Sequence, residues 1–241
     1  AEDGIRDIGV TGVQTCALPI WKEWFLFKNI PIKILNNFNS NIEIAKIISF
    51  IESILVNPRF VQYLEQIIVG EIPELKSRRI QAMYKDGAIY VSNFFDDPKI
   101  KEEKIARDII HEIAHSLEDG YGMDLYADSV LEEEFIGKRK RLYDILDKNN
   151  LEFSRNAFLN NLDYSPKVDN FLYNTVGYPK LTSFIQGLFL SPYCVTSLRE
   201  YFANGFEEYK CGDEKYLRSM CPILYSKLRL LDELVKDSLN G

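Results

Sequence analysis

Residues 111–115 read His111-Glu112-Ile113-Ala114-His115, and this stretch decides how the rest of the chain is interpreted. The 241 residues contain two histidines, and both lie in this motif. Positions i and i+4 of an α-helix lie on one face, one turn apart, so two neutral imidazoles can bind one metal ion. Glu112 faces the same site as a candidate general base. By composition alone this placement has odds of about one in a thousand, and a solvated helix turn with incidental histidines is the alternative.

The sequence around the motif predicts a helix over Ile100–Glu118. Apolar side chains cover one broad face of it, at Ile105, Ala106, Ile109, Ile110, Ile113 and Leu117. The opposite face gathers the polar residues Asp108, His111, Glu112 and His115. This pattern is typical of a helix that is buried on one side and open to a cleft on the other. Gly120 and Gly122 are predicted to end it.

Hydrophobic periodicity and turn residues predict the other elements. We expect a strand within Trp21–Leu35, a helix after Pro58, and a hairpin over Ile80–Phe94 with its turn at Lys85-Asp86-Gly87. Further helices are expected over Asn41–Leu55, Tyr126–Lys148, Ser197–Lys210, Asp213–Met220 and Pro222–Leu239. The aromatic stretch between Lys148 and Pro192 has no clear pattern. No repeat or linker is evident, so we expect one α+β domain, mainly helical with a small sheet.

Composition restricts the class of protein. Hydrophobic residues make up 46% of the chain and aromatic residues 13%, which is typical of a globular protein. No run of eighteen apolar residues occurs, so no membrane-spanning segment is expected. The net charge of −7 argues against a nucleic-acid surface. Cys194, Cys211 and Cys221 indicate neither a disulfide framework nor a zinc knuckle, and a single Cys211–Cys221 pair stays open.

Residues 1–20 read AEDGIRDIGVTGVQTCALPI. This stretch resembles the conceptual translation of a sequencing-adapter primer, with Ile8-Gly9 where a short index would fall. The resemblance ends at Trp21, where the composition changes. We therefore interpret residues 1–20 as an artefact, leave Cys16 out of the cysteine count, and treat residues 21–241 as a single domain. The natural N-terminus is then expected to be missing, and a genuine flexible arm is the alternative.

A catalytic zinc ion takes three protein ligands and a water. The chain has no third histidine, so the third ligand has to be a carboxylate, a thiolate or a phenol. Ser116–Gly120 follows the motif, which excludes the metzincin pattern with its glycine and third histidine. Glu134 is one candidate, because eighteen residues separate it from His115, as in some zinc aminopeptidases. Glu200 is the other candidate, although it could instead complete a capping box with Ser197.

The segment Tyr193–Leu230 resembles the C-terminal part of the anthrax lethal factor catalytic domain and of its smaller relatives, the Pro-Pro endopeptidases. Those proteins carry a zinc-binding glutamate in a helix of the type E-F/Y-F-A-E, and this chain has Glu-Tyr-Phe-Ala at Glu200–Ala203. They place a tyrosine seven residues before that glutamate, where this chain has Tyr193. Their aromatic helix end and Leu-x-x-x-x-Pro-x-x-Tyr stretch are matched by Phe206–Tyr209 and Leu217–Tyr225. Together with the HExxH helix, the resemblance covers about a third of the chain.

The resemblance implies a zincin-like fold and a zinc-dependent endopeptidase of the glutamate-zincin (gluzincin) type. His111, His115 and Glu200 would bind Zn²⁺. Glu112 would act as general base, and Tyr193 would donate its hydroxyl to the developing oxyanion. The substrate would be a protein or peptide, with no nucleic-acid or membrane partner. Family members are mostly secreted, and the oligomeric state is not implied.

Two features depart from the family pattern. Asn204 stands at the position of the family's second helix glutamate, which could weaken metal binding if that glutamate orients a ligand. The interval from His115 to Glu200 is also longer than in the family, which implies an inserted helical segment between Tyr126 and Leu190. We therefore do not expect specificity for proline-rich bonds to transfer.

Three other functions stay open at this point. The first is an intracellular regulatory peptidase that cleaves a repressor, which the Ala203-Asn204 pair favours. The second is a non-catalytic zinc-binding module of a toxin or virion, and the third is a zinc aminopeptidase that uses Glu134. For a peptidase, Ala88–Ser92 is a candidate edge strand for an extended peptide, or part of a hairpin packed into the core.

Overall fold

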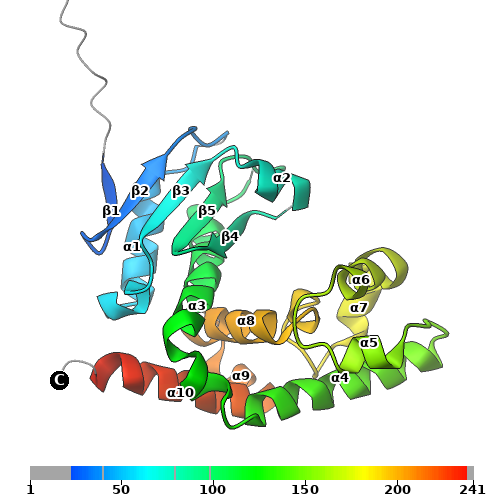
Figure 1. Cartoon of the computed structure of the whole chain (residues 1–241). Coiled ribbons are helices and arrows are strands. Elements are labelled where there is room, and N and C mark those ends of the chain that lie inside the picture. The colour runs from blue at the N-terminus through cyan, green and yellow to red at the C-terminus, as the bar shows by residue number, and fades with distance from the viewer. Residues whose placement is uncertain (1–22, 40, 79, 98, 238–241) are drawn as a thin grey trace, which may run out of the picture.

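The structure is a computed structural model, and it describes residues 23–39, 41–78, 80–97 and 99–237 (Figure 1). The strands are β1 (Trp24–Leu26), β2 (Ile30–Ile34), β3 (Gln66–Gly70), β4 (Ala82–Lys85) and β5 (Ala88–Ser92). The longer helices are α1 (Ile44–Ile54), α3 (Glu102–Tyr126), α4 (Val130–Lys148), α8 (Leu198–Cys211) and α10 (Pro222–Asp237). The short helices are η1 (Pro58–Val61), α2 (Pro73–Arg78), α5 (Arg155–Leu159), α6 (Pro166–Asn170), η2 (Phe171–Val176), α7 (Tyr178–Phe184), η3 (Tyr193–Val195) and α9 (Glu214–Met220). The fold is therefore α+β and mainly helical.

The described strands form one mixed sheet in the order β1-β2-β3-β5-β4. The inner pairs β2–β3 and β3–β5 are parallel, while β1–β2 and β4–β5 are antiparallel hairpins. Strand β3 lies at the centre, where its apolar run Ile67-Ile68-Val69 suits a strand with neighbours on both sides. Strand β4 has a strand neighbour on one side and forms an edge of the sheet.

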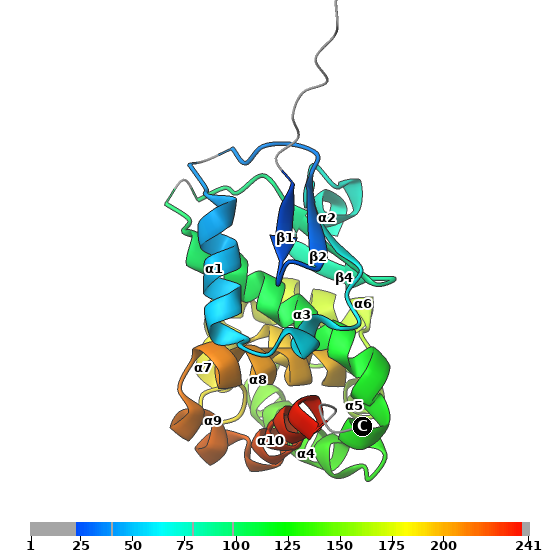
Figure 2. The ribbon, with the colours of Figure 1, turned by 90° about the vertical axis from the view of Figure 1, so that its left-hand side faces the viewer.

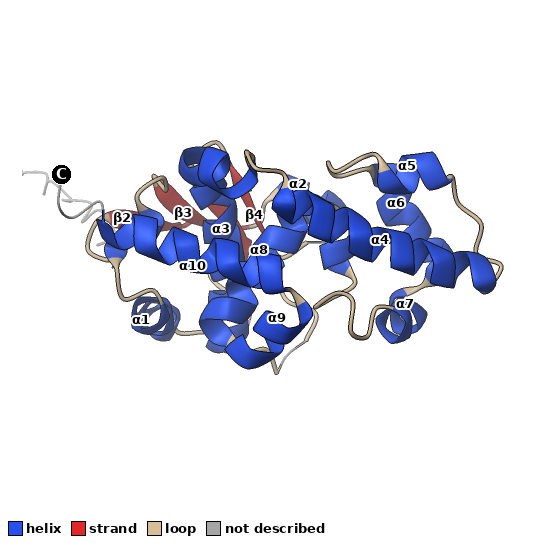
Figure 3. Cartoon of the chain, turned by 90° about the horizontal axis from the view of Figure 1, so that it is seen from below, coloured by secondary structure: helices blue, strands red, loops and turns tan. Residues whose placement is uncertain are grey.

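Helix α3 separates the sheet from the helical part of the molecule. Figure 2 shows the sheet and α1 on one side of α3, and α8, α10 and α4 on the other. Ile109, Ile110, Ile113 and Leu117 of α3 are almost fully buried and belong to one core with residues of both parts. Seen from below, α4 runs out to a group formed by α5, α6 and α7 (Figure 3).

The hairpin and the C-terminal helices agree with the sequence-based expectation. Strands β4 and β5 are joined by Asp86 and Gly87, whose φ angles of 49° and 77° suit a tight hairpin turn. The predicted helices over Asn41–Leu55 and Tyr126–Lys148 correspond to α1 and α4, and the three helices predicted after Pro192 correspond to α8, α9 and α10. The stretch without a clear pattern contains four short helices, α5, α6, η2 and α7.

Other expectations about local structure were incomplete or wrong. The strand expected within Trp21–Leu35 is present, but the described part of this range contains two strands, because Phe27 and Lys28 turn the chain with φ angles of 51° and 60°. The helix expected after Pro58 is only the short turn η1, and the apolar residues that follow belong to β3. A buried parallel strand and a short buried helix both appear in sequence as an apolar run, so periodicity does not separate them.

The motif helix continues past both glycines that were predicted to end it. It ends at Tyr126, eight residues beyond the expected Glu118. A Cβ atom on Gly120 would lie 2.0 Å from the Cζ atom of Tyr63. Gly120 therefore gives Tyr63 room to pack against α3, and it is a packing glycine and not a helix stop.

The described residues also answer the questions about membrane spans and cysteine pairing that the sequence raised. No helix among them is long and apolar enough to span a membrane. Cys194, Cys211 and Cys221 are free thiols, so the Cys211–Cys221 pair that the sequence left open does not form. The adapter-like stretch with Cys16 lies outside the described residues, and the structure does not test that interpretation.

Candidate metal centre

Helix α3 places both imidazoles on its cleft-facing side. The rings of His111 and His115 lie 5.2 Å apart between centroids, and their planes are tilted by 78°. The opposite side of α3 is buried in the core, which fixes the rotation of the helix. The spacing of the motif therefore brings the two rings together, as predicted.

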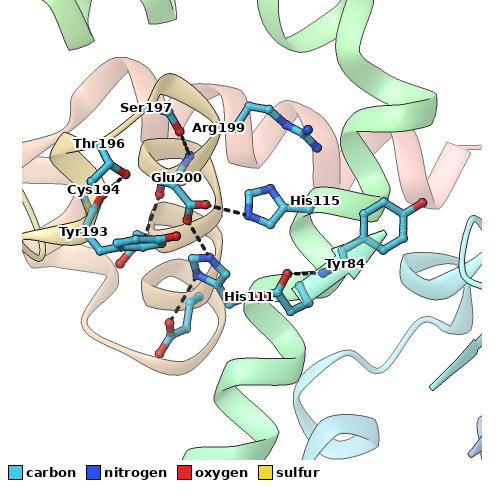
Figure 4. Close-up of polar contacts among 12 residues, drawn as sticks. Tyr84, His111, His115, Tyr193, Cys194, Thr196, Ser197, Arg199 and Glu200 are labelled. Carbon is cyan, nitrogen blue, oxygen red and sulfur yellow. Dashed lines mark hydrogen bonds and ion pairs between the residues drawn. The ribbon is translucent and has the colours of Figure 1, made fainter. Parts of the chain in front are cut away.

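Glu200 reaches the same point from α8. Ser197 is the N-cap of α8, and its Oγ accepts the backbone N–H of Glu200 at 3.1 Å. Tyr201, Phe202 and Phe206 are buried and anchor the helix in the core. Only the serine half of the capping box is used in this way, because the Glu200 carboxylate is turned toward the two imidazoles (Figure 4).

The three side chains form a compact donor set. Glu200 Oε2 lies 3.0 Å from His111 Nε2, and Glu200 Oε1 lies 3.6 Å from His115 Nε2. One ligand atom from each residue can be chosen so that all three lie within 4.8 Å of one another. Among the described residues, His111, His115 and Glu200 are the group that could bind a metal ion in this way.

The charges in this group stabilise one another. Burial lowers the pKa of His111, but its hydrogen bond to Glu200 and the nearby carboxylates outweigh burial and raise the pKa overall. The pKa of His115 is raised in the same way, by Glu118 and Glu200 acting against burial. Burial acts to raise the pKa of Glu200, but the two histidines outweigh it and lower that pKa far below its ordinary range. Glu200 is therefore ionised.

Glu112 lies beside the imidazoles and is 9% exposed. Its Oε2 atom accepts the backbone N–H of Tyr84, in edge strand β4, at 2.7 Å. Burial raises its pKa above the ordinary value for glutamate. The hydroxyl of Tyr84 donates to Asp119 on the same helix at 2.5 Å, so the edge strand is tied to α3 at two points.

Tyr193 lies in η3, just before the N-cap of α8, and lines the same cleft. Figure 4 shows its ring beside Glu200, on the side of α8 that faces the imidazoles. Burial raises the pKa of its phenol well above the ordinary value, and the charge of Glu200 adds to this effect. The hydroxyl therefore stays protonated and can donate a hydrogen bond.

Glu134 does not join this group. Its carboxylate accepts the Tyr201 hydroxyl at 2.8 Å and the backbone N–H groups of Ile223 and Leu224 at 2.9 and 3.2 Å. Those N–H groups belong to the first turn of α10, so Glu134 caps that helix from α4. The aminopeptidase alternative loses its third ligand.

The hydrogen bonds of Asn204 do not involve either imidazole. Its Nδ2 donates to the Glu200 carbonyl at 2.9 Å, and its Oδ1 accepts the Ser191 hydroxyl at 2.8 Å. Two glutamates that sequence reasoning missed lie beside the Nδ1 atoms instead. Glu118 Oε2 is 2.8 Å from His115 Nδ1, and Glu207 Oε2 is 3.8 Å from His111 Nδ1. A search for carboxylates one or two helical turns beyond each ligand would have found both.

The centre lies in a cleft of about 1380 Å³. One wall comes from β4 and the other from residues between Asp163 and Tyr178, with α3 and Tyr193 also contributing. The expectation that Ala88–Ser92 could form the peptide-binding edge was wrong, because β5 pairs with β3 and β4 and only β4 faces the cleft.

Comparisons with known proteins add no relative to this description. No family model, no curated protein and no solved structure matches the chain. The side-chain geometry of His111, His115 and Glu200 is therefore the basis for assigning a function.

Proposed function

We propose that this chain is a zinc-dependent endopeptidase in which His111, His115 and Glu200 bind the metal. The observation that carries the proposal is the meeting of Glu200 with both Nε2 atoms, from a position 89 residues along the chain from His111. A structural role for Glu200 would not require its carboxylate to face two imidazoles. The proposal agrees with the resemblance to the catalytic domain of lethal factor and to the Pro-Pro endopeptidases, and it includes a zincin-like fold.

The donor set fits zinc in number, type and spacing. Catalytic zinc sites commonly use two histidines and one glutamate, bound at about 2.0–2.2 Å. Tetrahedral geometry then separates the ligand atoms by about 3.3–3.6 Å. The separations of 3.0 and 3.6 Å between the imidazole nitrogens and the Glu200 oxygens lie near this range. The three ligand atoms together lie within 4.8 Å of one another.

Glu112 is the group that would take a proton during hydrolysis. Zinc in such a centre supplies a water whose pKa is about 7 and a Lewis acid for the scissile carbonyl. Since Glu112 Oε2 is bonded to Tyr84, we assign the proton to Oε1. Burial moves the pKa of Glu112 upward, toward the range in which a general base works best near neutral pH.

Tyr193 would stabilise the negative charge that develops on the substrate oxygen. Its hydroxyl stays protonated, since burial raises its pKa, and it lines the cleft next to Glu200. A donor placed where charge develops lowers the barrier more than it strengthens substrate binding. Tyr193 is therefore assigned to the reaction step and not to metal binding.

The edge strand β4 would bind the substrate backbone. The Tyr84 N–H points at Glu112 and so faces away from β5. Since backbone polar groups of alternate residues point the same way in an antiparallel pair, those of Ala82 also face away from β5. An extended peptide could add to this edge. The cleft of about 1380 Å³ exceeds the range of about 300–1,000 Å³ for small-molecule pockets, which favours a polymeric substrate.

The test is cleavage of a peptide library by the zinc-loaded protein, with Glu112→Gln as the matched control. The library contains each peptide with an acetylated and with a free N-terminus, and products are identified by mass spectrometry. We expect internal cleavage that chelation removes and zinc restores. Glu112→Gln should bind zinc like the wild type and lose about 10²- to 10⁴-fold in rate.

Other outcomes would reject the proposal. Trimming that requires a free N-terminal amine would indicate an aminopeptidase. Tight zinc binding through the three ligands without cleavage of any peptide would favour the non-catalytic zinc-binding module. Equal cleavage by the wild type and Glu112→Gln would point to a contaminating protease.

A further inference from the structure

The Glu118 carboxylate lies beside the candidate centre and has three side-chain hydrogen-bond partners. It lies on α3 one turn beyond His115 and is 9% exposed. Its Oε2 atom is 2.8 Å from His115 Nδ1 and accepts Arg199 Nε at 3.0 Å. Its Oε1 atom accepts the Tyr126 hydroxyl at 2.5 Å. Three partners therefore determine where this carboxylate lies.

The contact with Glu118 determines which ring nitrogen of His115 is available to bind a metal ion. A carboxylate accepts hydrogen bonds and donates none, so the hydrogen shared with Glu118 belongs to Nδ1. In the neutral ring the lone pair is then on Nε2, which lies 3.6 Å from Glu200 Oε1. Glu118 thus selects the tautomer and the ring orientation that a metal at this point requires.

Arg199 extends this arrangement to the second ligand helix. It immediately precedes Glu200 on α8, and its ion pair with Glu118 joins α8 to α3. Figure 4 shows Arg199 reaching from α8 toward α3, above His115. The helices α3 and α8, which supply the three candidate ligands, are therefore joined beside His115 by this ion pair as well as by the contacts of Glu200 with the imidazoles.

We propose that Glu118, supported by Arg199 and Tyr126, is the positioning residue that holds His115 for zinc. The inference rests on the zinc centre of the proposed function. It also distinguishes the two histidines, because among the described residues His115 has a carboxylate within hydrogen-bond distance of its Nδ1 atom and His111 does not. Glu207 Oε2 is 3.8 Å from His111 Nδ1, beyond hydrogen-bond distance, and Glu207 Oε1 accepts Arg107 Nε at 3.1 Å. Glu118 therefore carries more of the ligand positioning than Glu207 does.

The test compares Glu118→Gln with Glu207→Gln, which removes the corresponding charge near the other histidine. Zinc affinity is measured by competition with a chromophoric chelator. Loss of a group that orients a metal-binding histidine weakens metal binding by about 10- to 100-fold, and we expect this for Glu118→Gln. Glu207→Gln should weaken zinc binding by less than about tenfold.

A second measurement separates positioning from general loss of structure. The chain has two histidines, so ¹⁵N-histidine labelling gives two imidazole spin systems, one for each ligand. In Glu118→Gln we expect the nitrogen shifts of His115 to change while those of His111 stay close to wild type. Tyr126→Phe removes a single hydrogen bond to Glu118 and should weaken zinc binding in the same direction, with the fold retained. This variant keeps the inference testable if Glu118→Gln does not fold.

The outcomes are distinct from those that test the proposed function. Wild-type zinc affinity and unchanged His115 shifts in Glu118→Gln would overturn the inference and leave peptidase activity possible. Equal weakening by Glu118→Gln and Glu207→Gln would also overturn it, since net charge alone would then explain the loss. A protein that cleaves nothing but shows the predicted difference in zinc affinity would reject the peptidase and support the inference.

Discussion

The candidate metal centre and the surroundings of Arg139 both bury charged side chains, but they satisfy those charges differently. At the candidate centre, the Glu200 carboxylate faces the two imidazoles and all three side chains line the cleft. Arg139 on α4 is 0% exposed, and its guanidinium is bonded to backbone carbonyl oxygens. The polar groups of the candidate centre therefore lie at a cleft that a ligand could enter, whereas those around Arg139 are enclosed by the protein.

The partners of Arg139 indicate what it stabilises. Its guanidinium donates five hydrogen bonds, and the accepting carbonyls belong to Phe158, Asn161, Val195 and Thr196. The first two lie shortly before Asp163 in the sequence, where the wall of the cleft begins, and the last two immediately precede Ser197, the N-cap of α8. Burial lowers the pKa of Arg139 to about 10, so the side chain remains protonated at neutral pH. Arg139 thus joins the wall to the start of the helix that carries Glu200.

Arg139→Leu should have the largest effect of the changes considered, and it acts on stability. It leaves four carbonyls without this donor, and each buried unpaired group costs about 1–3 kcal/mol. We expect the free energy of unfolding to fall by at least about 4 kcal/mol in urea denaturation. A loss below about 1 kcal/mol, with zinc binding intact, would contradict the structural role.

Tyr193→Phe should have the opposite character, with a large effect on the reaction and a small one on stability. Loss of one donor to the developing oxyanion lowers kcat by about 10²- to 10³-fold. KM, zinc affinity and the melting temperature should stay close to wild type. If KM rises while kcat is unchanged, Tyr193 binds the substrate and does not stabilise charge in the transition state.

Removal of zinc should lower the melting temperature without unfolding the protein. The hydrophobic core contains none of the three candidate ligands, so we expect the metal to contribute through binding linkage. At a zinc concentration about one hundred times Kd, this contribution is about 2.7 kcal/mol. Thermal melts with and without a chelator measure it. Complete unfolding on chelation, detected by circular dichroism at room temperature, would mean that the centre is structural in the sense of a zinc finger.

Glu134→Gln should have the smallest effect and should separate the two candidate ligands. The substituted amide would keep part of the cap on α10 but lose the charge, at a cost of about 1–2 kcal/mol in the free energy of unfolding. Zinc affinity should not change, because Glu134 is bonded to Tyr201 and the first turn of α10. A loss of zinc binding as large as that of Glu200→Gln would contradict the assignment of the third ligand.

Sequence reasoning succeeded where the relevant contacts are local. The helical repeat alone brings His111 and His115 onto one face, and a two-residue turn alone brings β4 and β5 together. Glu200 and Glu134 were both candidates for the third ligand. The resemblance favoured Glu200, but spacing alone could not dismiss Glu134. Only the packing of α8 against α3 separates them, since it brings one carboxylate to the imidazoles and leaves the other under α10.

Sequence reasoning failed where a residue's role depends on distant partners. Gly120 reads as a helix stop, but Tyr63, 57 positions earlier in the sequence, determines that it is a packing site. Strand β3 reads as a short apolar run, and its neighbours β2 and β5 make it a strand. For the same reason the sequence could not decide whether Ala88–Ser92 is an edge strand or is packed inside the sheet, because strand order in a sheet is a tertiary property.

The sequence by itself determined the side chains that are available to this protein: one HExxH motif with two imidazoles, a candidate general base and a shortlist of carboxylates. The tertiary structure decided which carboxylate joins the imidazoles, which strand faces the cleft, and that Glu118 and not Asn204 is hydrogen-bonded to an imidazole. The physical reason is range. Helical and hairpin periodicities act over a few residues, whereas the position of Glu200 depends on burial of α3 and α8 in a common core.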